Sequence, residues 1–270
     1  MVELTVEELK KCQAEALKEV HDYCIKNGIK YYMVYGTLLG AVRHKGYIPW
    51  DDDIDIAMPR ADYERFIKEF NSSNSDAAYV VDISNNSDYY LDFAKVCHKN
   101  TVLIEHVYKP TPIGAYIDLF PLDFMPESEE QRAEFSGKLF KLKKKLVNKN
   151  YTPPYDKNNP LKIAAHIVVR TLTFASRKKT IKKIDELRKT YINNNTGLVE
   201  IAPGAFLKNV NSPSFDSFGE PILIQFEEYM FCAPKDYDFL LKKWYGDYMT
   251  PPPEAERVSH HGFKVYWKNS

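Results

Sequence analysis

The chain carries the segment Tyr-Gly-Thr-Leu-Leu-Gly at residues 35–40 and, close behind it, Trp-Asp-Asp-Asp-Ile-Asp-Ile at residues 50–56. The first segment predicts a strand over residues 31–35 that breaks at the glycine into a short helical turn. The second places Asp53 and Asp55 two positions apart, so that on a strand both carboxylates lie on one face. The residues between and after them alternate as a half-buried strand requires: Ile54, Ile56 and Met58.

Two carboxylates on one face repel each other, and a hard divalent cation such as Mg²⁺ or Mn²⁺ removes that cost. A glycine turn beside a strand with paired aspartates is the way a polymerase-β-like nucleotidyltransferase fold seats a nucleotide phosphate over its metal. An EF-hand calcium loop is excluded, because Ile56 and Asp62 stand where that loop needs Gly and Glu. The Asp-x-Asp motif of metal-dependent sugar transferases fits the pair alone, but it does not predict the upstream turn.

Such a site needs a third carboxylate on a neighbouring strand. Asp118 is the best candidate, since it lies in a hydrophobic strand pattern where an unpaired carboxylate is costly. Asp123 is the second candidate and a candidate substrate contact, although its position after Pro121 suggests a loop. A cap or turn role for Asp118 is the alternative. We therefore expect Asp51, Asp53, Asp55 and Asp118 to bind metal, the last three as catalytic residues and Asp51 as an outer or water-holding ligand.

Five residues are expected to contact a nucleotide-activated donor molecule: Gly36, Thr37, Arg43, Lys45 and Lys95. The N–H groups of the turn would hold phosphate oxygens, and the two basic residues after it would add charge, the arginine by its bidentate fork. Lys95 lies in an apolar strand and needs a phosphate or a carboxylate as partner, unless it reaches solvent at a sheet edge. The pair His260 and His261 follows a proline-rich loop and is a candidate substrate contact; an ordinary surface pair is the alternative.

These motifs resemble the LicD family, which includes bacterial phosphocholine transferases and is related to fukutin and the fukutin-related protein. The resemblance is carried by the run of residues 36–55, by residues 116–123, and by residues 245–249 continuing through the prolines 251–253 to the histidine pair. It touches residues 5–125 and 226–268 and covers the middle poorly. The family often has a second glycine where this chain has Tyr35.

The resemblance implies metal-dependent transfer of a phospho-alcohol group, phosphocholine first, from a CDP-activated donor such as CDP-choline to a hydroxyl. The acceptor would be a cell-surface glycan, such as lipopolysaccharide or capsule, a teichoic acid precursor, or a lipid-linked glycan. CMP would leave, and Asp118 would help to deprotonate the acceptor hydroxyl. Two alternatives remain open: a sugar-nucleotide-dependent glycosyltransferase, and a non-catalytic protein that binds nucleotide or glycan.

At 270 residues the chain fits one large α/β (α+β) domain with an appended helical part. We predict a nucleotidyltransferase-like core at 1–125, a basic helical insert at 126–197 and a segment returning to the core at 198–270. The insert is distinct in charge: residues 138–189 hold sixteen Lys and Arg against three acidic residues, a net +13 in a chain of net charge zero. This asymmetry predicts peripheral contact with an anionic membrane or acceptor, including through residues 143–145.

No apolar run of about 18 residues is present, and the N-terminal residues lack a signal-peptide pattern, so a cytoplasmic protein at the inner face of the membrane is expected. The four cysteines have no metal-type spacing, which favours free thiols. No nucleic-acid partner is expected.

Overall fold

The computed structural model describes residues 1–104, 113–150, 160–193, 196–201, 212–257 and 263–268. Its centre is a six-stranded mixed sheet with the order β1-β2-β6-β4-β3, and β7 pairs with β6. The strands are β1 (Tyr32–Met33), β2 (Asp55–Pro59), β3 (Ala78–Val81), β4 (Ala94–His98), β6 (Tyr116–Phe124) and β7 (Val199–Ile201). β2 and β6 run parallel, and the other pairs run antiparallel. The expected mixed α/β class is confirmed.

One face of the sheet is covered by α1 (Val6–Asn27) and α3 (Arg60–Glu69). Thr5 and Glu8 form a capping box at the start of α1, and Gly28 ends it at φ 62° in the left-handed region that glycine adopts freely. The apolar side chains of β2 that point to this face, Ile56 and Met58, are fully buried in the main core. That core also contains these residues of the two helices: Leu17, Val20 and Phe66.

The other face carries α2 (Tyr35–His44), α6 (Tyr237–Tyr245) and the short helix η4 (Phe215–Ser217). Ala57, Phe120 and Leu122 point to this side and pack with residues of the C-terminal part, including Phe218 and Leu240. The hairpin of β8 (Ile222–Phe226) and β9 (Tyr229–Ala233) packs against α1 and α2. Strand alternation thus gives the sheet one face that packs against α1 and α3 and a second face, on the side of α2 and α6, that holds the candidate site.

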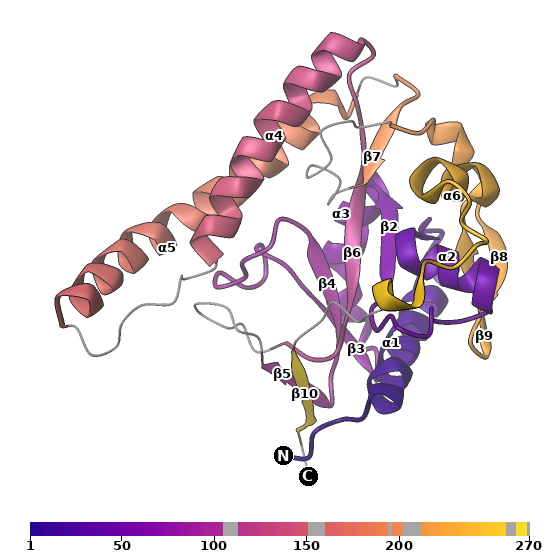
Figure 1. Ribbon diagram of the computed structural model, residues 1–270, viewed down its shortest axis with the longest axis horizontal. Coiled ribbons are helices and arrows are strands. Elements are labelled where there is room, and N and C mark those ends of the chain that lie inside the picture. The colour runs from indigo at the N-terminus through magenta and orange to yellow at the C-terminus, as the bar shows by residue number, and fades with distance from the viewer. Residues whose placement is uncertain (105–112, 151–159, 194–195, 202–211, 258–262, 269–270) are drawn as a thin grey trace.

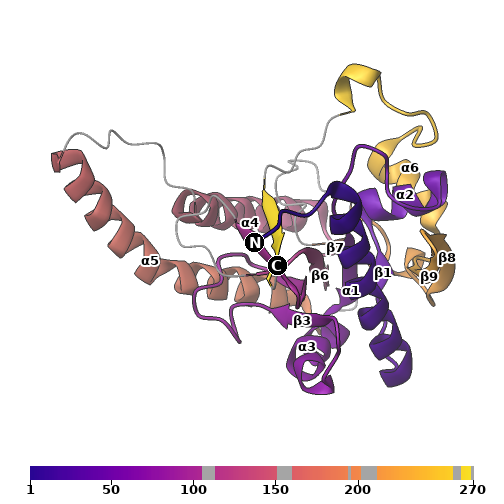
Figure 2. The ribbon, with the colours of Figure 1, turned by 90° about the horizontal axis from the view of Figure 1, so that it is seen from below.

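A separate two-stranded sheet pairs β5 (Thr101–Ile104) with β10 (Lys264–Trp267), and the N-terminal segment lies beside β10, where the N–H of Leu4 donates to the carbonyl of Val265 (Figures 1 and 2). Short helices η1 (Phe70–Ser73), η2 (Lys189–Tyr191) and η5 (Glu254–Glu256) complete the described elements. All four cysteines are buried free thiols, as expected from their spacing.

Two long helices, α4 (Glu129–Asn150) and α5 (Pro160–Arg188), pack side by side, and α5 extends well beyond the sheet (Figures 1 and 2). Their shared core contains Phe135, Leu139, Leu146, Ile181 and Ile184. The chain then returns through β7, which pairs with the end of β6. The helical character expected for this part of the chain is confirmed, whereas the three-segment division of the chain stays a prediction.

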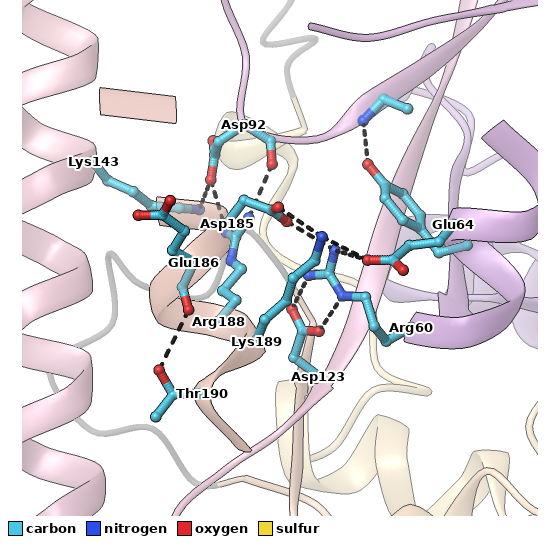
Figure 3. Close-up of polar contacts among 12 residues, drawn as sticks. Arg60, Glu64, Asp92, Asp123, Lys143, Asp185, Glu186, Arg188, Lys189 and Thr190 are labelled. Atoms are coloured by element: carbon cyan, nitrogen blue, oxygen red, sulfur yellow. Dashed lines mark hydrogen bonds and ion pairs between the residues drawn. The ribbon is translucent and has the colours of Figure 1, made fainter. Parts of the chain in front are cut away.

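Buried charges fasten this helical pair to the sheet (Figure 3). Asp92, just before β4, lies 2.8 Å from the guanidinium of Arg188 and 3.5 Å from Lys143 Nζ, measured from its Oδ2 atom. All three side chains are buried. The expectation that Lys143 belongs to a docking surface for anions is therefore wrong: an ammonium that faces a buried carboxylate is not presented to a partner. The sequence pattern could not separate Lys143 from its exposed neighbours.

We expect Asp92→Ala to lower the free energy of unfolding by about 3–5 kcal/mol, because it leaves two buried cations without their carboxylate. Burial disfavours the ionised form, but Arg188 and Lys143 outweigh it and lower the pKa of Asp92. The stabilisation is therefore full above the ordinary carboxyl pKa and is lost as the pH falls through the lowered folded-state value. Urea unfolding measures it, with Asp22→Ala in the exposed Lys18–Asp22 pair as control. Equal losses in the two variants would contradict this role.

Candidate active site

Three charged side chains form a row across three adjacent strands. In the sheet register Asp55 of β2 is the partner of Asp118 of β6, and Asp118 is the partner of Lys95 of β4. Register partners have Cβ atoms about 4.5–5.5 Å apart and share a face. Lys95 Nζ donates to Asp118 Oδ1 at 2.7 Å, and the lysine side chain is 4% exposed. The parallel pairing of β2 with β6 thus creates the pair of acids, and β4 supplies one cation beside it.

This row is not neutral. The pKa of Asp55 is raised well above its ordinary value, first by burial and then by the charges of Asp53, Asp118 and Asp51, while Lys95 opposes the shift. Asp53 lies two residues before β2, so it approaches the row from the extended segment rather than from the strand. Carboxylates held this closely raise the free energy of the folded state unless a cation accompanies them.

The chemistry of these donors fits Mg²⁺ or Mn²⁺, since all are hard carboxylate oxygens. Their positions do not form a closed coordination shell: in the described part of the chain, no group of three or more Asp, Glu, His or Cys side chains is placed to hold a metal ion. Asp118 is held by Lys95 in this arrangement. The sequence therefore identified a set of acids that lies together, and its metal-binding role remains a prediction.

The start of α2 lies against these acids. Thr37 is buried, and its Oγ1 accepts the N–H of Asp55 at 2.7 Å. A Cβ on Gly36 would lie 2.8 Å from Asp51 Oδ2, so the glycine allows Asp51 close approach to the first turn of α2. The N-cap residue of this helix is Val34, whose side chain makes no capping hydrogen bond. A helix N-terminus carries partial positive charge and N–H donors, which suit a phosphate next to the acids.

The left-handed backbone at this turn belongs to Tyr35 and not to Gly36. Tyr35 has φ 49°, and α2 begins there, so the strand expected over residues 31–35 ends at Met33. A backbone position with positive φ favours glycine. This preference gives a physical reason for the second glycine that the LicD family often has at this position. The Tyr35 ring packs against Trp244 with ring centroids 5.0 Å apart. A glycine at this position could not make this contact.

The basic residues after the turn have different surroundings. Arg43 donates from Nη1 to the carbonyl of Tyr248 at 2.7 Å, and burial is the main cause that lowers its pKa. Lys45 follows the last residue of α2 at φ 63° and is exposed. The structure thus places Arg43 between α2 and the C-terminal segment, and Lys45 at the far end of the helix.

Asp123 is the clear correction among the acids. It lies on β6 and not in a loop, and because five positions separate it from Asp118, the two point to opposite faces. Both of its oxygens accept from Arg60 of α3 at 2.6 Å, and both side chains are buried (Figure 3). This bidentate ion pair supports the contact between sheet and helix, so Asp123 is neither the third acid of the row nor an exposed substrate contact. His260 and His261 lie outside the described residues.

Aromatic residues beside the row were not predicted. Lys95 Nζ lies 3.0 Å from the centroid of the Tyr116 ring. Tyr116 precedes Asp118 by two positions on the same strand, so the alternation of β6 contains the signal for it. Tyr245 comes from α6, far away in the sequence; its pKa is raised by burial and then by Asp55, Asp51 and Asp53. Nothing in its local sequence connects Tyr245 to the acids.

The comparisons with known proteins agree with the resemblance to the LicD family that the motifs around these acids indicate. The family model for the LicD/FKTN/FKRP nucleotidyltransferase domain matches residues 28–155, which include all three charges of the row. Residues 28–155 are therefore similar to a LicD-family domain, and the resemblance seen in the motifs of the chain is confirmed.

Individual relatives extend this similarity. Over 268 residues the chain is 26% identical to the lipopolysaccharide cholinephosphotransferase LicD of Haemophilus influenzae, covering 98% of this chain and 99% of that protein. It is 32% identical over 148 residues to an uncharacterized protein of Rickettsia typhi, which is 53% of this chain and 41% of that protein. It is also 39% identical over 51 residues to the human ribitol 5-phosphate transferase FKRP, which is 17% of this chain and 10% of that protein.

Replacing one acid should stabilise the protein when no divalent cation is present. We expect Asp55→Asn to raise the free energy of unfolding at pH 7 in EDTA, because the raised pKa of Asp55 means that the folded state disfavours the ionised carboxylate. The gain should shrink as the pH falls and the parent residue takes up its proton. Urea unfolding measures it, with the exposed Asp76→Asn as control. A less stable Asp55→Asn variant would contradict the repulsion.

Proposed function

We propose that this protein transfers a phospho-alcohol group, in a divalent-metal-dependent reaction, from a CDP-activated donor to a hydroxyl group of a cell-surface glycan. The observation that carries the proposal is the registered row of Asp55, Asp118 and Lys95 within a segment similar to a LicD-family domain. The mixed sheet and the helix that starts at Tyr35 are compatible with a polymerase-β-like nucleotidyltransferase core, the kind of domain that the family description states.

Mg²⁺ or Mn²⁺ would be held by Asp53, Asp55 and Asp118, with Asp51 as an outer or water-holding ligand. The bound ion would neutralise charge on the phosphates of the donor. The repulsion that raises the pKa of Asp55 supports this proposal, because it is a cost that a cation removes.

The remaining roles belong to side chains and backbone of the chain itself. The first turn of α2, at Gly36 and Thr37, would direct N–H donors to phosphate oxygens. Arg43 and Lys45 would add positive charge for the donor phosphates. Lys95 holds Asp118 by an ion pair, and Asp118 would accept the proton of the acceptor hydroxyl. Lys95 is also close enough to the acids to contact a phosphate placed over them.

Phosphocholine, carried by CDP-choline, is the group that we propose for transfer. The relative named as a cholinephosphotransferase matches along 98% of this chain, whereas the one named as a ribitol 5-phosphate transferase matches along 17%. The name of the longer match also supports a lipopolysaccharide-type glycan as acceptor. Product analysis separates this reaction from the alternatives: CMP is expected, a glycosyltransferase releases UDP or GDP, and a non-catalytic binding protein releases neither.

The acceptor would meet the protein at the inner face of a membrane. None of the described helices combines the length and hydrophobicity needed to span a bilayer. The exposed lysines of α5 provide a surface for anionic headgroups: Lys178, Lys179, Lys182 and Lys183. Nearer the start of α5, which extends beyond the sheet (Figure 2), Leu161 and Val168 are 81% and 58% exposed. These two residues are seven positions apart and therefore lie on one side of the helix. Basic and apolar residues together are what an interfacial helix requires.

The central test replaces the acids. Asp53→Ala and Asp55→Ala should each abolish CMP release from CDP-choline at saturating Mg²⁺, by a factor of at least about 10³, because a missing ligand removes charge stabilisation of the transition state. The Asn variants should behave nearly alike, and all four should stay folded by circular dichroism. Asp76→Asn is the matched control. Near-normal turnover of either alanine variant would falsify the assignment.

The membrane contact is tested by charge reversal. A triple variant with Lys178, Lys179 and Lys182 changed to Glu should lose most of its binding to anionic phospholipid vesicles, since each basic residue near such a surface contributes roughly 1 kcal/mol. The loss should diminish at high salt. The KM for CDP-choline should not change. Reversal of three exposed lysines of α1, Lys11, Lys18 and Lys26, is the control. Equal vesicle binding by both triple variants would assign α5 to ordinary surface.

A further inference from the structure

Two arginines that are distant in the sequence are connected to one tryptophan beside the acids, Arg257 by direct contact and Arg43 through His44. Arg257 follows η5, and its guanidinium carbon lies 5.3 Å from the centroid of the Trp50 ring. Its Nε donates to the carbonyl of Pro252 at 2.9 Å, which fixes the side chain on the C-terminal loop. Trp50 immediately precedes Asp51, so this guanidinium is placed at the border of the acidic segment.

Arg43 reaches this place from the last turn of α2. Its Nη1 donates to the carbonyl of Tyr248, and its Nε contacts Nδ1 of His44 at 3.4 Å. The His44 ring meets Trp50 edge to face with centroids 6.3 Å apart. The contacts thus run continuously from Arg43 through His44 and Trp50 to Arg257. After burial, the charge of Arg257 is the main cause that lowers the pKa of Arg43, in agreement with two guanidiniums that are close neighbours.

Within the described residues, neither arginine has a carboxylate within 4.0 Å, whereas the buried cations Arg60, Lys95 and Arg188 each have one. Both are held by backbone carbonyls instead. Two neighbouring guanidiniums without a carboxylate repel each other, and an anion between them removes that cost. The planar fork of arginine fits phosphate oxygens in particular.

The arginine pair also has a defined position relative to the acids. The pKa of Tyr245 is raised by burial and by Asp55, Asp51 and Asp53, and it is lowered by Arg43, so its hydroxyl lies in the field of both groups. Arg43 is six residues beyond Thr37 on α2, roughly 9 Å along the helix axis. A diphosphate that bridges the two regions would therefore place one phosphate over the acids and the other at the arginines.

We propose that Arg43 and Arg257 together bind the phosphate that leaves with the nucleotide, and that Trp50 holds Arg257 in place for this contact. The inference rests on the proposed function, because it names the group of the CDP donor that the pair recognises. It adds Arg257 and Trp50 to the site, two residues to which the sequence analysis assigned no role.

Calorimetric binding of two separate product-like probes tests the proposal. CMP retains the leaving phosphate, whereas phosphocholine carries only the transferred one. In Arg257→Gln the Kd for CMP should rise about tenfold or more, because a charge-assisted bidentate contact is lost, and phosphocholine binding should not change. Arg257→Lys should restore only part of the affinity, since an ammonium lacks the fork. Arg65→Gln, which removes another arginine that donates to a backbone carbonyl, should bind CMP like the parent.

Equal CMP affinity of Arg257→Gln and the parent would overturn the inference, as would a loss confined to phosphocholine. A parent that binds neither CMP nor inorganic pyrophosphate would overturn it as well. Failure of the proposed function is distinguishable: Asp55→Asn would then still release CMP from CDP-choline at the normal rate, whatever the arginine variants do. The Arg257 variants should have the same thermal unfolding temperature as the parent, which shows that they are folded.

Discussion

The parallel pairing of β2 with β6 is the constraint on which the candidate site depends. It places Asp55 opposite Asp118, and the antiparallel partner β4 then adds Lys95 in the same row. Large apolar side chains fix this register, because Ile56 and Leu119 are buried against the helices on the opposite face of the sheet. A slip of one residue would turn those side chains away from the core. The burial of these apolar side chains therefore offsets the repulsion between the two carboxylates.

Two groups of charged side chains in the molecule have opposite character. Around Asp92 and Asp123, each carboxylate faces at least one arginine, and these pairs join α3 and the α4–α5 helices to the sheet (Figure 3). Around Asp55 the acids outnumber the single lysine of the row, while Arg43 and Arg257 gather nearby with backbone carbonyls as partners. The first group is satisfied within the protein. The second has separated regions of negative and positive charge, and a ligand that carries phosphates together with a divalent cation complements both.

The sequence predicted what depends on local patterns. The alternation around Asp55 and Asp118 was sufficient to expect two strands with acids on one face. It could not predict contacts that only the register and the tertiary packing create. Asp123 resembles a loop residue after a proline, yet its strand continues, and Arg60 lies opposite it. Likewise, Lys143 lies among exposed lysines in the sequence, and only the packing of α4 directs it to Asp92.

Direct observation of a bound ion tests the central claim, that the acids brought together by β2 and β6 form a divalent-metal centre. Mn²⁺ can substitute for Mg²⁺ at oxygen sites, and its free concentration can be followed by electron paramagnetic resonance during titration of the protein with CDP-choline present. The account predicts one tightly bound Mn²⁺ per chain in the parent and in Asp76→Asn, and its loss in Asp55→Asn and Asp118→Asn. Unchanged Mn²⁺ binding in both of the latter variants would contradict it.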